Sequence, residues 1–374
     1  MNRLGIAVLY DENGIIDRYI EVLLSSLKSE IQEYVIVING YMDDESIHRL
    51  KQYTTKIYSR KNIGFDAGAY KDAFLQFIPQ STWKSYDEIV LMNDTFFGPV
   101  TPMKETWELF DSDNVDFWGI TRHPAQRLSD GNVVSSHIQS YFIVIKNRLI
   151  TSQFFTEFWE KLSYPRTYQE AVKNFEIEFT VFFEANGFSG KSLMDLREGL
   201  ASFNQNSENP CFHSYELLKE FRIPFLKKKF LNLESPIYAN MIDALEYIEA
   251  KTDYNTDLIW ESLFRMSGEK RNWSAFSYGK LDKFYASHVR IYIYGAGKYA
   301  KNMQRYFQYR GWTFECFLVS DNAEEFHNCK NFKDVDIART DGLILALGRT
   351  AFSEVYPVIK KEINEEQLML PDYL

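Results

Sequence analysis

The sequence predicts an α/β fold whose central sheet is mostly parallel. Short apolar segments rich in β-branched residues alternate with segments of helical periodicity from residue 4 onward. A polar loop with two glycines, residues 60–68, is followed by a strand that ends in Asn93-Asp94. Near the C-terminus, another strand begins at Val289 and is followed by a glycine turn and the start of a helix. Alternation of this kind is typical of a parallel sheet covered by helices.

The length and composition indicate a globular protein with more than one domain. The chain has 374 residues, of which 45% are apolar and 16% aromatic, and this is enough for well-packed cores. Its 42 basic and 52 acidic residues give a net charge of −10. Because affinity for nucleic-acid phosphates needs clustered Lys and Arg, we expect no nucleic-acid partner.

The cysteines and the apolar segments bear on where the protein works. Cys211, Cys316 and Cys329 are an odd number without metal-ligand spacing, so we interpret them as reduced thiols of a cytoplasmic chain. The first apolar run is too short for a secretion signal, and no run reaches the ~18 residues needed to span a bilayer. We therefore expect a soluble protein, or one in peripheral contact with a membrane.

The N-terminal part is expected to alternate strand and helix, with turn residues between the segments. The expected strands are Leu4–Tyr10, Tyr34–Gly40, Thr55–Tyr58 and Ile89–Met92, and the expected helices are 15–27, Glu45–Tyr53 and Ala69–Phe77. The loop Arg60–Gly68 would face the N-terminus of the last of these helices, where an anion could be bound.

Further strands and aromatic helices follow, and the chain is expected to divide into three parts. The strands are Val115–Ile120 and His137–Ile145, and the helices are Leu149–Leu162 and Tyr168–Gly187. Residues 232–285 have a helical pattern without strong strand signals, so we interpret them as a connecting segment. The first domain then covers residues 1–231, and the last covers 286–374.

The loop after the third strand has two interpretations. Asn62-Ile-Gly-Phe-Asp-Ala-Gly68 places Gly64 and Gly68 where the backbone can approach a ligand, and Asp66 where a carboxylate could accept a hydrogen bond from a ribose or a base. The alternative is an ordinary turn capped by Asn62 and Asp66. Taken alone, the loop favours neither interpretation.

The strand end at Asn93-Asp94 favours ligand binding. Ligands of open α/β sheets bind at the carboxyl ends of the strands. A carboxylate beside an amide there can hold Mg²⁺ or Mn²⁺ against a diphosphate, which stabilises the charge on a leaving nucleotide. The alternative is a turn Asp before Gly98-Pro99, and because only one carboxylate is present, binding without a metal stays open.

Glu176 is the candidate catalytic base. It lies with Glu178 in a helix flanked by aromatic residues, and a carboxylate in apolar surroundings is expected to have a raised pKa that suits it to accept a proton from a hydroxyl. Residues two apart point to different faces of a helix, so at most one of the two is catalytic. The alternative is that both are solvated surface residues.

His213 and the run Lys227-Lys228-Lys229 are less specific signals. A lone histidine is more often a core or surface residue than a ligand. The lysines could contact a phosphate or a lipid head group, although a solvated face is the default interpretation.

The segment Val289–Ala300 predicts a strand, a Gly-x-Gly-x-x-Ala turn and a helix start, with Asp321 further on, as in a small Rossmann-like domain. The fit to a dinucleotide site is partial, because Ala300 occupies the third glycine position and the domain is short for a complete dinucleotide fold. We prefer a structural or accessory role, and an NAD-linked oxidoreductase would depend on this turn alone.

Several motifs occur together in the first 235 residues. They are Asn62-Ile-Gly-Phe-Asp-Ala-Gly68, Leu91-Met-Asn-Asp-Thr-Phe-Phe-Gly-Pro99, Asp116-Phe-Trp-Gly-Ile-Thr121, His137-Ile-Gln-Ser-Tyr-Phe142, Phe175-Glu-Ile-Glu-Phe-Thr180, Asn209-Pro-Cys-Phe-His213 and Ile223-Pro-Phe-Leu-Lys227. With them the chain resembles the rhamnan synthesis protein F family of bacterial polysaccharide glycosyltransferases. The resemblance implies a GT-A-like nucleotide-sugar transferase that uses a donor such as dTDP-rhamnose or UDP-galactofuranose to extend a lipid-linked glycan at the cytoplasmic face of the membrane.

The resemblance also implies roles for individual residues. Asn62 and Asp66, with Gly64 and Gly68, would lie at the donor nucleotide. Asn93-Asp94 would stand where GT-A enzymes keep their Asp-x-Asp metal motif, and His213 could supply a late metal ligand. His137 and Gln139 would lie near the sugar or acceptor, and Lys227 is grouped with them as substrate-binding. Glu176 matches the family's helix carboxylate better than Glu178 does.

Asn93 departs from the family's metal motif, because it replaces an acidic residue. This leaves open a Mg²⁺ or Mn²⁺ ion held mainly by Asp94 and the diphosphate, or no metal. The start of the C-terminal domain resembles the small Rossmann-like domains of NeuD-type sugar acyltransferases, which implies its fold only.

Two hypotheses follow. The first is an inverting glycosyltransferase of capsule, O-antigen or rhamnan synthesis, in which Glu176 deprotonates the acceptor hydroxyl and Asp94, with Mg²⁺ or Mn²⁺ as the optional intermediary, stabilises the departing nucleoside diphosphate. The second is a non-catalytic assembly protein of such a pathway that recruits partners through the C-terminal domain.

Overall fold

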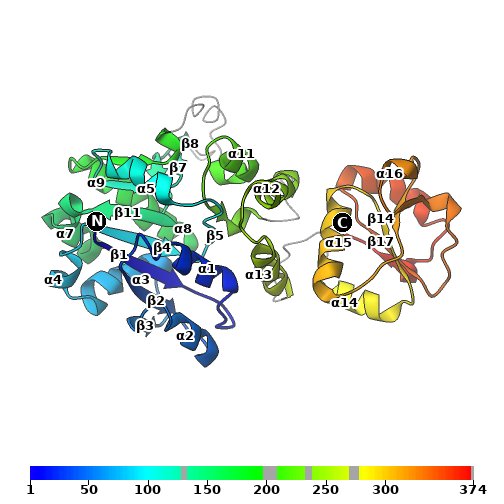
Figure 1. Cartoon of the computed structure of the whole chain (residues 1–374), viewed down its shortest axis with the longest axis horizontal. Helices are drawn as coiled ribbons and strands as arrows, with labels where there is room; N and C mark the ends of the chain where they lie inside the picture. The colour runs from blue at the N-terminus through cyan, green and yellow to red at the C-terminus, as the bar shows by residue number, and fades with distance from the viewer. Residues whose placement is uncertain (128–132, 197–208, 232–237, 269–277, 372–374) are drawn as a thin grey trace. The chain divides into compact units, whose positions relative to one another are not determined.

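The computed structural model describes residues 1–127, 133–196, 209–231, 238–268 and 278–371 (Figure 1). By its internal contacts the chain divides into two compact units. The first consists of Met1–Phe230 and Asp243–Leu258, and the second of Leu231–Ile242 and Ile259–Leu374. The three-part division at residues 231 and 285 stays a prediction.

A seven-stranded sheet forms the centre of the first unit. Its strands are β1 (Arg3–Leu9), β2 (Glu33–Asn39), β3 (Ile57–Arg60), β4 (Glu88–Asn93), β6 (Phe117–Gly119), β11 (Phe142–Lys146) and β12 (Gly190–Ser192). They lie in the order β12-β6-β11-β4-β1-β2-β3. Only β11 runs antiparallel to its neighbours in this sheet, so the predicted α/β class with a mostly parallel sheet is confirmed.

Helices connect these strands, and others follow the last of them. The connecting helices are α1 (Arg18–Ser26), α2 (Asp44–Leu50), α3 (Phe65–Asp72), the π-helical η1 (Ala73–Phe77), α4 (Gln80–Trp83), α5 (Lys104–Asp111), α6 (Asn147–Ile150), α7 (Gln153–Lys161), α8 (Tyr168–Ala171), the π-helical η2 (Val172–Ile177) and α9 (Glu178–Ala185). After β12 come α11 (Ser214–Lys219), α12 (Tyr238–Lys251) and α13 (Asp257–Gly268), of which the last two are divided between the two units. Short 3₁₀ turns cover Met194–Leu196, Pro210–Phe212 and Lys228–Phe230.

Small two-stranded ribbons complete the unit. β5 (Phe96–Phe97) pairs with β13 (Leu226–Lys227), β7 (Arg122–His123) with β10 (His137–Ile138), and β8 (Gln126–Arg127) with β9 (Val133–Val134). All three pairs are antiparallel.

Aromatic-rich helices cover one face of the large sheet. Buried side chains of β1, β4 and β11 pack there against α3, η1, α7 and α9. The Phe74 ring lies 4.9 Å from Trp159 and 5.0 Å from Phe155, measured between centroids. Such ring pairs add roughly 0.5–1.5 kcal/mol each beyond the burial of their area. This core fixes α3 and η2, which carry two carboxylates of the site described below.

The opposite face of the sheet is covered by α1 and α5. The rings of Trp107 and Phe110 from α5 lie 5.0 and 4.2 Å from Trp118 of β6. The Tyr34 hydroxyl of β2 donates a hydrogen bond to the Leu24 carbonyl of α1 at 3.0 Å. The first unit therefore has three layers, with the sheet between two layers of helices (Figure 1).

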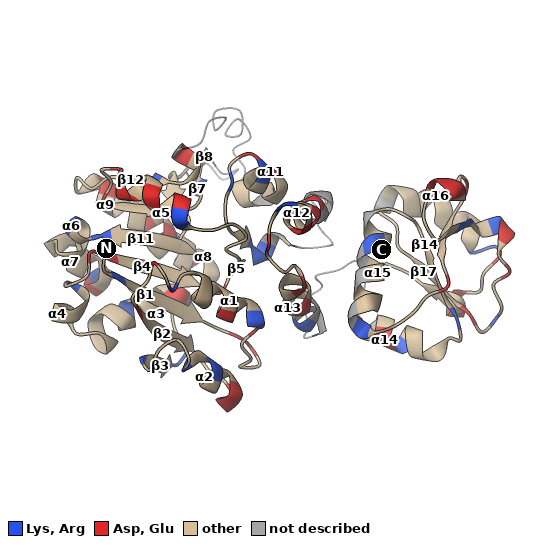
Figure 2. Cartoon of the chain, viewed as in Figure 1, with Lys and Arg blue, Asp and Glu red and all other residues tan. Residues whose placement is uncertain are grey.

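Acidic and basic residues are interspersed along the helices (Figure 2). In α2, Asp44 and Glu45 occupy the first turn and His48 and Arg49 the last, which complements the helix dipole. The Asp43 side chain caps this helix by accepting a hydrogen bond from the Ser46 N–H at 2.7 Å.

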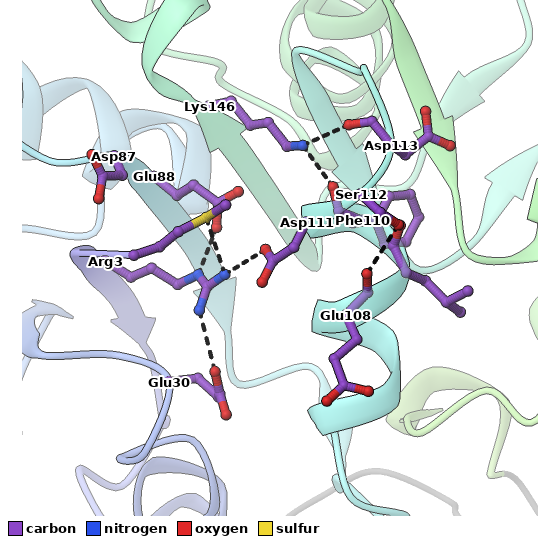
Figure 3. Close-up of polar contacts among 12 residues, drawn as sticks. Arg3, Glu30, Asp87, Glu88, Glu108, Phe110, Asp111, Ser112, Asp113 and Lys146 are labelled. Carbon is purple, nitrogen blue, oxygen red and sulfur yellow. Dashed lines mark hydrogen bonds and ion pairs between the residues drawn. The ribbon is translucent and has the colours of Figure 1, made fainter.

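Arg3 is the centre of a buried ion-pair network at the amino end of β1 (Figure 3). Its guanidinium lies 2.5 Å from Glu88, 3.2 Å from Glu30 and 2.7 Å from Asp111. It also lies 4.4 Å from the centroid of the Trp107 ring. Arg3 is 3% exposed and Glu88 is 1% exposed, so each charge depends on the other for compensation. The network joins β1, β4 and α5 at the sheet edge opposite to the strand ends that carry Asp94.

The helix predicted to begin at Ala69 begins instead at Phe65, so that prediction is wrong by one turn. Gly64 is the reason, because its φ of 81° turns the chain into the helix and its carbonyl accepts the Gly68 N–H at 2.7 Å. Asp66 and Gly68 therefore belong to the helix and not to the loop.

The single strand predicted over His137–Ile145 is also wrong, because it divides into β10 and β11. Between them, the Gln139 N–H donates to the Thr121 carbonyl at 3.0 Å, and the Ser140 N–H donates to the Glu176 carboxylate at 2.9 Å. These partners lie outside the large sheet, so its ladder is interrupted here. The predicted helix Leu149–Leu162 likewise divides in two, because the Ser152 hydroxyl caps a new start at Gln153.

The second unit contains a five-stranded sheet in which all strands are parallel. The strands β14 (Ile291–Tyr294), β15 (Phe317–Val319), β16 (Cys329–Asn331), β17 (Gly342–Leu345) and β18 (Leu368–Met369) lie in the order β16-β15-β14-β17-β18. Its helices include α14 (Tyr278–Ser287), α15 (Lys298–Arg310) and α16 (Arg349–Ile359). The predicted strand, glycine turn and helix start are confirmed, with Gly295 at φ 115° after β14.

Within the described ranges, no helix is both long enough and apolar enough to cross a bilayer.

Candidate functional site

The carboxyl ends of β1 and β4 bring Asp94 beside the start of the first loop. The Asp94 Oδ2 accepts the Tyr10 N–H at 2.8 Å, and its backbone carbonyl accepts the Tyr19 hydroxyl at 2.7 Å. Lys228 approaches the same hydroxyl, with its Nζ 2.9 Å from the Tyr19 oxygen. Asp94 is thus fixed at the strand edge where ligands of α/β sheets bind.

Asp66 and Asn93 meet at this edge, although they come from different elements. The Asn93 Nδ2 donates to Asp66 Oδ2 at 3.0 Å, and the Ala67 N–H donates to Asp66 Oδ1 at 2.9 Å. Phe65 precedes Asp66 with a φ of 55°, a strained value for a bulky residue. The Asn39 side chain holds this turn by donating to the Phe65 carbonyl at 3.0 Å.

The amide oxygen of Asn93 is occupied by Thr95. It accepts the Thr95 hydroxyl at 2.6 Å and the Thr95 N–H at 3.1 Å. Asn93 therefore serves to connect Asp66 to Thr95, and its side chain is used within the protein.

Glu176 lies in the π-helical turn η2, and such turns occur frequently at functional sites. Its Oε2 accepts both the N–H and the hydroxyl of Ser140, at 2.9 and 2.7 Å. Its Oε1 lies 3.6 Å from Nε2 of His137. The Nδ1 of His137 lies 2.7 Å from the Ser135 carbonyl, and its ring stacks on His123 at 5.1 Å. Glu178 is exposed, so the two glutamates do lie on different faces.

The prediction that Glu176 has a raised pKa is wrong. Burial does raise the pKa of this carboxyl, but the hydrogen bond with His137, the charge of Lys227 and the two hydrogen bonds from Ser140 outweigh it. Together they lower the pKa of Glu176 to about 2. The apolar neighbours in the sequence pack elsewhere, and the carboxylate faces polar groups from other segments.

Lys227 reaches the site because β13 pairs with β5, directly after Asn93-Asp94-Thr95. In this register Lys227 lies opposite Phe96. Its Nζ donates to the Thr95 hydroxyl at 2.6 Å and lies 4.5 Å from the centroid of the Tyr141 ring. Burial lowers the pKa of Lys227, and the charges of Glu176, Asp66 and Asp94 among its neighbours oppose this effect.

The other two carboxylates respond to burial differently from Glu176. Burial raises the pKa of Asp66, although the hydrogen bond from Asn93 opposes it, and the charge of Glu176 raises it further. Burial also raises the pKa of Asp94, against the charge of Lys228 and the hydrogen bond from Tyr10. A bound cation would favour the ionised form of both groups.

A buried polar cluster lies beside Lys227. The Thr121 hydroxyl lies 2.8 Å from Gln139 Oε1 and 2.9 Å from the Tyr141 hydroxyl, and the Cys211 thiol lies 3.2 Å from the same Gln139 oxygen. Gln139 is 4% exposed, and its Nε2 donates to none of the described residues. Burial raises the pKa of Cys211 to about 11, so its thiol is protonated at neutral pH.

The predicted metal ligands offer few donor atoms. Among the described residues, no group of three or more His, Cys, Asp and Glu side chains is arranged to hold a metal ion. Asn93 uses its amide oxygen on Thr95, and one oxygen of Asp94 accepts the Tyr10 N–H. His213 is half-buried immediately before α11. The described part of the chain therefore offers no dedicated cage for a metal, and an ion there would depend on Asp94 and on oxygens of a ligand.

The structure brings together most of the predicted site residues, but not all by direct contact. Hydrogen bonds link Asp66, Asn93 and, through Thr95, Lys227, and Glu176 lies 3.6 Å from His137. The charges of Asp66, Asp94 and Glu176 act on Lys227, and Gln139 lies beside Lys227 in the polar cluster. Asn62 is exposed on the loop before Gly64. Gly68 has a packing role, because a Cβ there would lie 2.3 Å from the Ile63 carbonyl oxygen.

Sequence reasoning missed Ser140, Thr95 and Tyr141. Ser140 and Tyr141 follow the predicted Gln139 directly, and Thr95 follows Asp94, so all three lie inside or beside motifs already identified. Their roles depend on groups distant in the chain, Glu176 and Lys227, and local sequence carries no signal for those pairings.

Comparison with known proteins identifies a family. A family model described as rhamnan synthesis protein F matches residues 34–330. A curated protein of Sinorhizobium fredii (strain NBRC 101917 / NGR234), described as uncharacterized protein y4gN, is 25% identical over 200 residues. The match covers 54% of this chain and 50% of that protein, so the chain spans about half the length of the curated relative it matches.

Solved structures with some similarity are enzymes that handle nucleotides, by their descriptions. 4-diphosphocytidyl-2C-methyl-D-erythritol synthase from Anaerococcus prevotii DSM 20548 is 15% identical with a TM-score of 0.31, covering 51% of this chain and 86% of that one. Glucosyl-3-phosphoglycerate synthase from Mycobacterium tuberculosis, in complex with Mn²⁺, uridine diphosphate and glucosyl-3-phosphoglycerate, is 14% identical with a TM-score of 0.24, covering 39% and 58%. At such low scores the family match alone supports an assignment.

Proposed function

The chain belongs to the rhamnan synthesis protein F family, and on that premise we propose that it is a glycosyltransferase that moves a sugar from a nucleotide-sugar donor to a growing cell-surface polysaccharide. The observation that carries the proposal is the convergence of Asp66, Asp94, Glu176 and Lys227 at the carboxyl edge of a mostly parallel sheet. In this group of four side chains, a carboxylate can accept a proton and the ammonium group can bind a diphosphate.

In the proposed reaction, Glu176 receives the proton of the acceptor hydroxyl. The hydroxyl oxygen forms a bond to the anomeric carbon while the bond from that carbon to the diphosphate oxygen breaks, and the nucleoside diphosphate leaves with the electron pair. Attack from the side opposite to the leaving group inverts the anomeric configuration. Because the pKa of Glu176 is about 2, its carboxylate is ionised at neutral pH, the protonation state that a base requires, but so low a pKa makes it a weak base until the site changes on binding substrate.

The donor would lie along the edge formed by α3 and β4. Asp66, at the start of α3, accepts donor hydroxyl or base N–H groups, and Gly64 and the exposed Asn62 line the approach to it. The diphosphate lies at Asp94. His137 and Gln139 contact the sugar or the acceptor, and the Gln139 Nε2, which donates to none of the residues that the structure describes, serves as a hydrogen-bond donor.

Mg²⁺ or Mn²⁺ is one source of positive charge for the diphosphate. When bound, the ion would be held by Asp94 and diphosphate oxygens, with His213 as the other candidate ligand, and it would neutralise charge on the leaving group.

We propose rhamnose or galactofuranose as the sugar, from a dTDP- or UDP-linked donor, and a lipid-linked glycan of a capsule, O-antigen or rhamnan as the acceptor. The family description, which names rhamnan synthesis, supports rhamnose among these. Such a reaction would take place in the cytoplasm, with the chain in peripheral contact with the inner face of the membrane. The absence of a membrane-spanning helix among the described residues is compatible with this location.

A donor panel tests the proposal. The full chain is incubated with dTDP- and UDP-sugars, with and without a glycan acceptor, and release of nucleoside diphosphate is measured. We expect release from at least one donor and a raised melting temperature in the presence of dTDP or UDP. If no donor is consumed and neither nucleotide shifts the melting temperature, the chain is not a transferase of this class.

The second candidate is a non-catalytic assembly protein that acts through the second unit. The parallel sheet of that unit, which contributes none of the site residues above, is the observation in its favour. Removing residues 286–374 separates the two candidates. Turnover should remain if the first unit is the enzyme, whereas an assembly protein would lose its function together with this region.

A further inference from the structure

Lys227 is the cation at the centre of the site, and its surroundings distinguish it from a surface lysine. Strand β13 is hydrogen-bonded to β5, so the Lys227 backbone is fixed within a ribbon next to Asp94. One N–H of its ammonium group is directed to the Thr95 hydroxyl at 2.6 Å, and the Tyr141 ring lies on another side at 4.5 Å. Both contacts position the charge without neutralising it.

The ammonium group of Lys227 has donors left over. Among the described residues it forms one hydrogen bond, to Thr95, and no ion pair within 4.0 Å. A lysine ammonium has three N–H donors, so two remain for a ligand. The three carboxylates act on Lys227 through their charges, and no described carboxylate forms an ion pair with it, which is the arrangement expected of a cation that awaits an anion.

A second cation acts on Asp94 through its charge. Lys228 contacts the Tyr19 hydroxyl, which in turn donates to the Asp94 carbonyl. The ring centroid of Tyr19 lies 4.7 Å from Lys228 Nζ. The charges of two ammonium groups, those of Lys227 and Lys228, therefore act at Asp94.

The same region is poorly suited to a divalent ion. The amide oxygen of Asn93, which would be the second ligand of the motif, accepts two hydrogen bonds from Thr95. A divalent ion at Asp94 would also lie close to two ammonium groups, and like charges at such distances repel strongly in a partly buried site.

We propose that Lys227 receives the leaving diphosphate, with Lys228 supporting it, and that transfer therefore proceeds without a divalent metal. The proposal rests on the proposed glycosyltransferase function and names the group that stabilises its leaving group. As the bond from the anomeric carbon to the diphosphate oxygen breaks, negative charge grows on that oxygen. The two remaining Lys227 N–H groups donate to the diphosphate where this charge develops.

Three variants and one chelator test the proposal in the full chain. Lys227→Met removes the ammonium group and keeps the length of the side chain. Lys227→Gln is a second variant that retains a donor without the charge. Lys229→Met is the matched control, because Lys229 is the next lysine in the run but is exposed beside Tyr168. Each protein is assayed with the donor found in the panel, before and after treatment with EDTA.

We expect the wild-type chain to keep its turnover in EDTA. Lys227→Met and Lys227→Gln should lower kcat/KM by about 100-fold or more, in the range found when one preorganised charge-stabilising donor is removed. They should also weaken binding of the nucleoside diphosphate by at least about 10-fold relative to the nucleoside monophosphate, since only the diphosphate reaches Lys227. Lys229→Met should stay within about 2-fold of wild type.

The outcomes separate this proposal from the function on which it rests. Loss of wild-type turnover in EDTA, restored by added Mn²⁺, overturns the metal-independent step whatever the variants do. Lys227 variants that melt like wild type and turn over at its rate overturn the role of Lys227. If both Lys227 variants unfold, the EDTA result with wild type decides. A wild-type chain that consumes no donor and binds neither dTDP nor UDP refutes the glycosyltransferase function itself.

Discussion

Ser140 holds one carboxylate oxygen of Glu176 with two donors, its backbone N–H at 2.9 Å and its hydroxyl at 2.7 Å. Both bonds end on Oε2, and the other oxygen lies 3.6 Å from His137. The carboxylate is therefore fixed in one orientation by groups from a different segment. A proton acceptor held in this way loses little entropy when an acceptor hydroxyl arrives.

Glu176→Gln should abolish sugar transfer and leave nucleotide binding intact. The amide has a similar shape but cannot accept the proton of the acceptor hydroxyl, so we expect kcat to fall by about 10²–10⁴-fold. The dissociation constant for dTDP or UDP, measured by calorimetry, should change by less than about 3-fold, since the proposed nucleotide contacts are those of Asp66 and the diphosphate contacts those near Asp94. Glu178→Gln is the matched control, because Glu178 is exposed two residues away, and it should retain wild-type kcat. Equal losses in both variants would contradict the role of Glu176.

The stabilisation provided by Glu176 should depend on pH in a defined direction. Its pKa is lowered from 4.5 to about 2 in the folded chain, so its ionised form stabilises the fold above about pH 4.5. This contribution is lost as the pH falls toward 2. The difference in the free energy of unfolding between wild type and Glu176→Gln should therefore shrink between pH 5 and pH 2.5 when measured by urea denaturation. A difference that grows on acidification would show that the carboxyl is protonated in the folded chain.

Gly68→Ala should destabilise the first unit and weaken nucleotide binding. The new Cβ would lie 2.3 Å from the Ile63 carbonyl oxygen, a backbone atom, so the turn that precedes Asp66 must move. We expect a loss of about 1–3 kcal/mol in the free energy of unfolding, as for other overpacked sites. Gly297→Ala is the control, because a Cβ there meets no atom within 4 Å, and it should change stability by less than about 1 kcal/mol. Chemical denaturation measures the free energy of unfolding of both variants.

Arg3→Met should destabilise the chain strongly, because Glu88 would remain buried without its partner. Breaking one side of a buried pair typically costs about 3–5 kcal/mol. Arg3→Met combined with Glu88→Leu should recover much of this loss, since both charges are then absent. Lys56→Met, which breaks the more exposed pair with Glu33, should cost less than about 1 kcal/mol. If the double variant is as unstable as Arg3→Met, the loss comes from packing against Trp107 and not from the stranded charge.

The strands β1, β2 and β4 and the place of Asn93 and Asp94 at a strand end could be predicted because their signals are local. Apolar runs with β-branched residues predict β1, β2 and β4, and a polar residue that ends such a run lies at the carboxyl edge of a parallel sheet. The bounds of α3 could not be predicted as well, because its start depends on the left-handed conformation of Gly64 and Phe65.

The electrostatics of the site could not be predicted from local sequence. Glu176 is surrounded by aromatic residues in the sequence, which suggests a raised pKa, yet His137, Ser140 and Lys227 lower it in the folded chain. The division of the predicted strand at Ser140 has the same origin, because its N–H donates to Glu176 and not to a neighbouring strand. Contacts between distant segments therefore decide both the lowered pKa of Glu176 and the division of the strand at Ser140.

The pairing of β13 with β5 also sets the time at which the site is completed during synthesis. Lys227 follows Thr95 by 132 residues, and the two are in direct contact in the folded chain. At about 5–20 residues per second, a ribosome needs on the order of 10 seconds to make the intervening segment. Strands β1 to β4 have left the ribosome long before Lys227 is added. During that interval the nascent chain carries Asp66 and Asp94 at the edge of these strands without the ammonium group of Lys227.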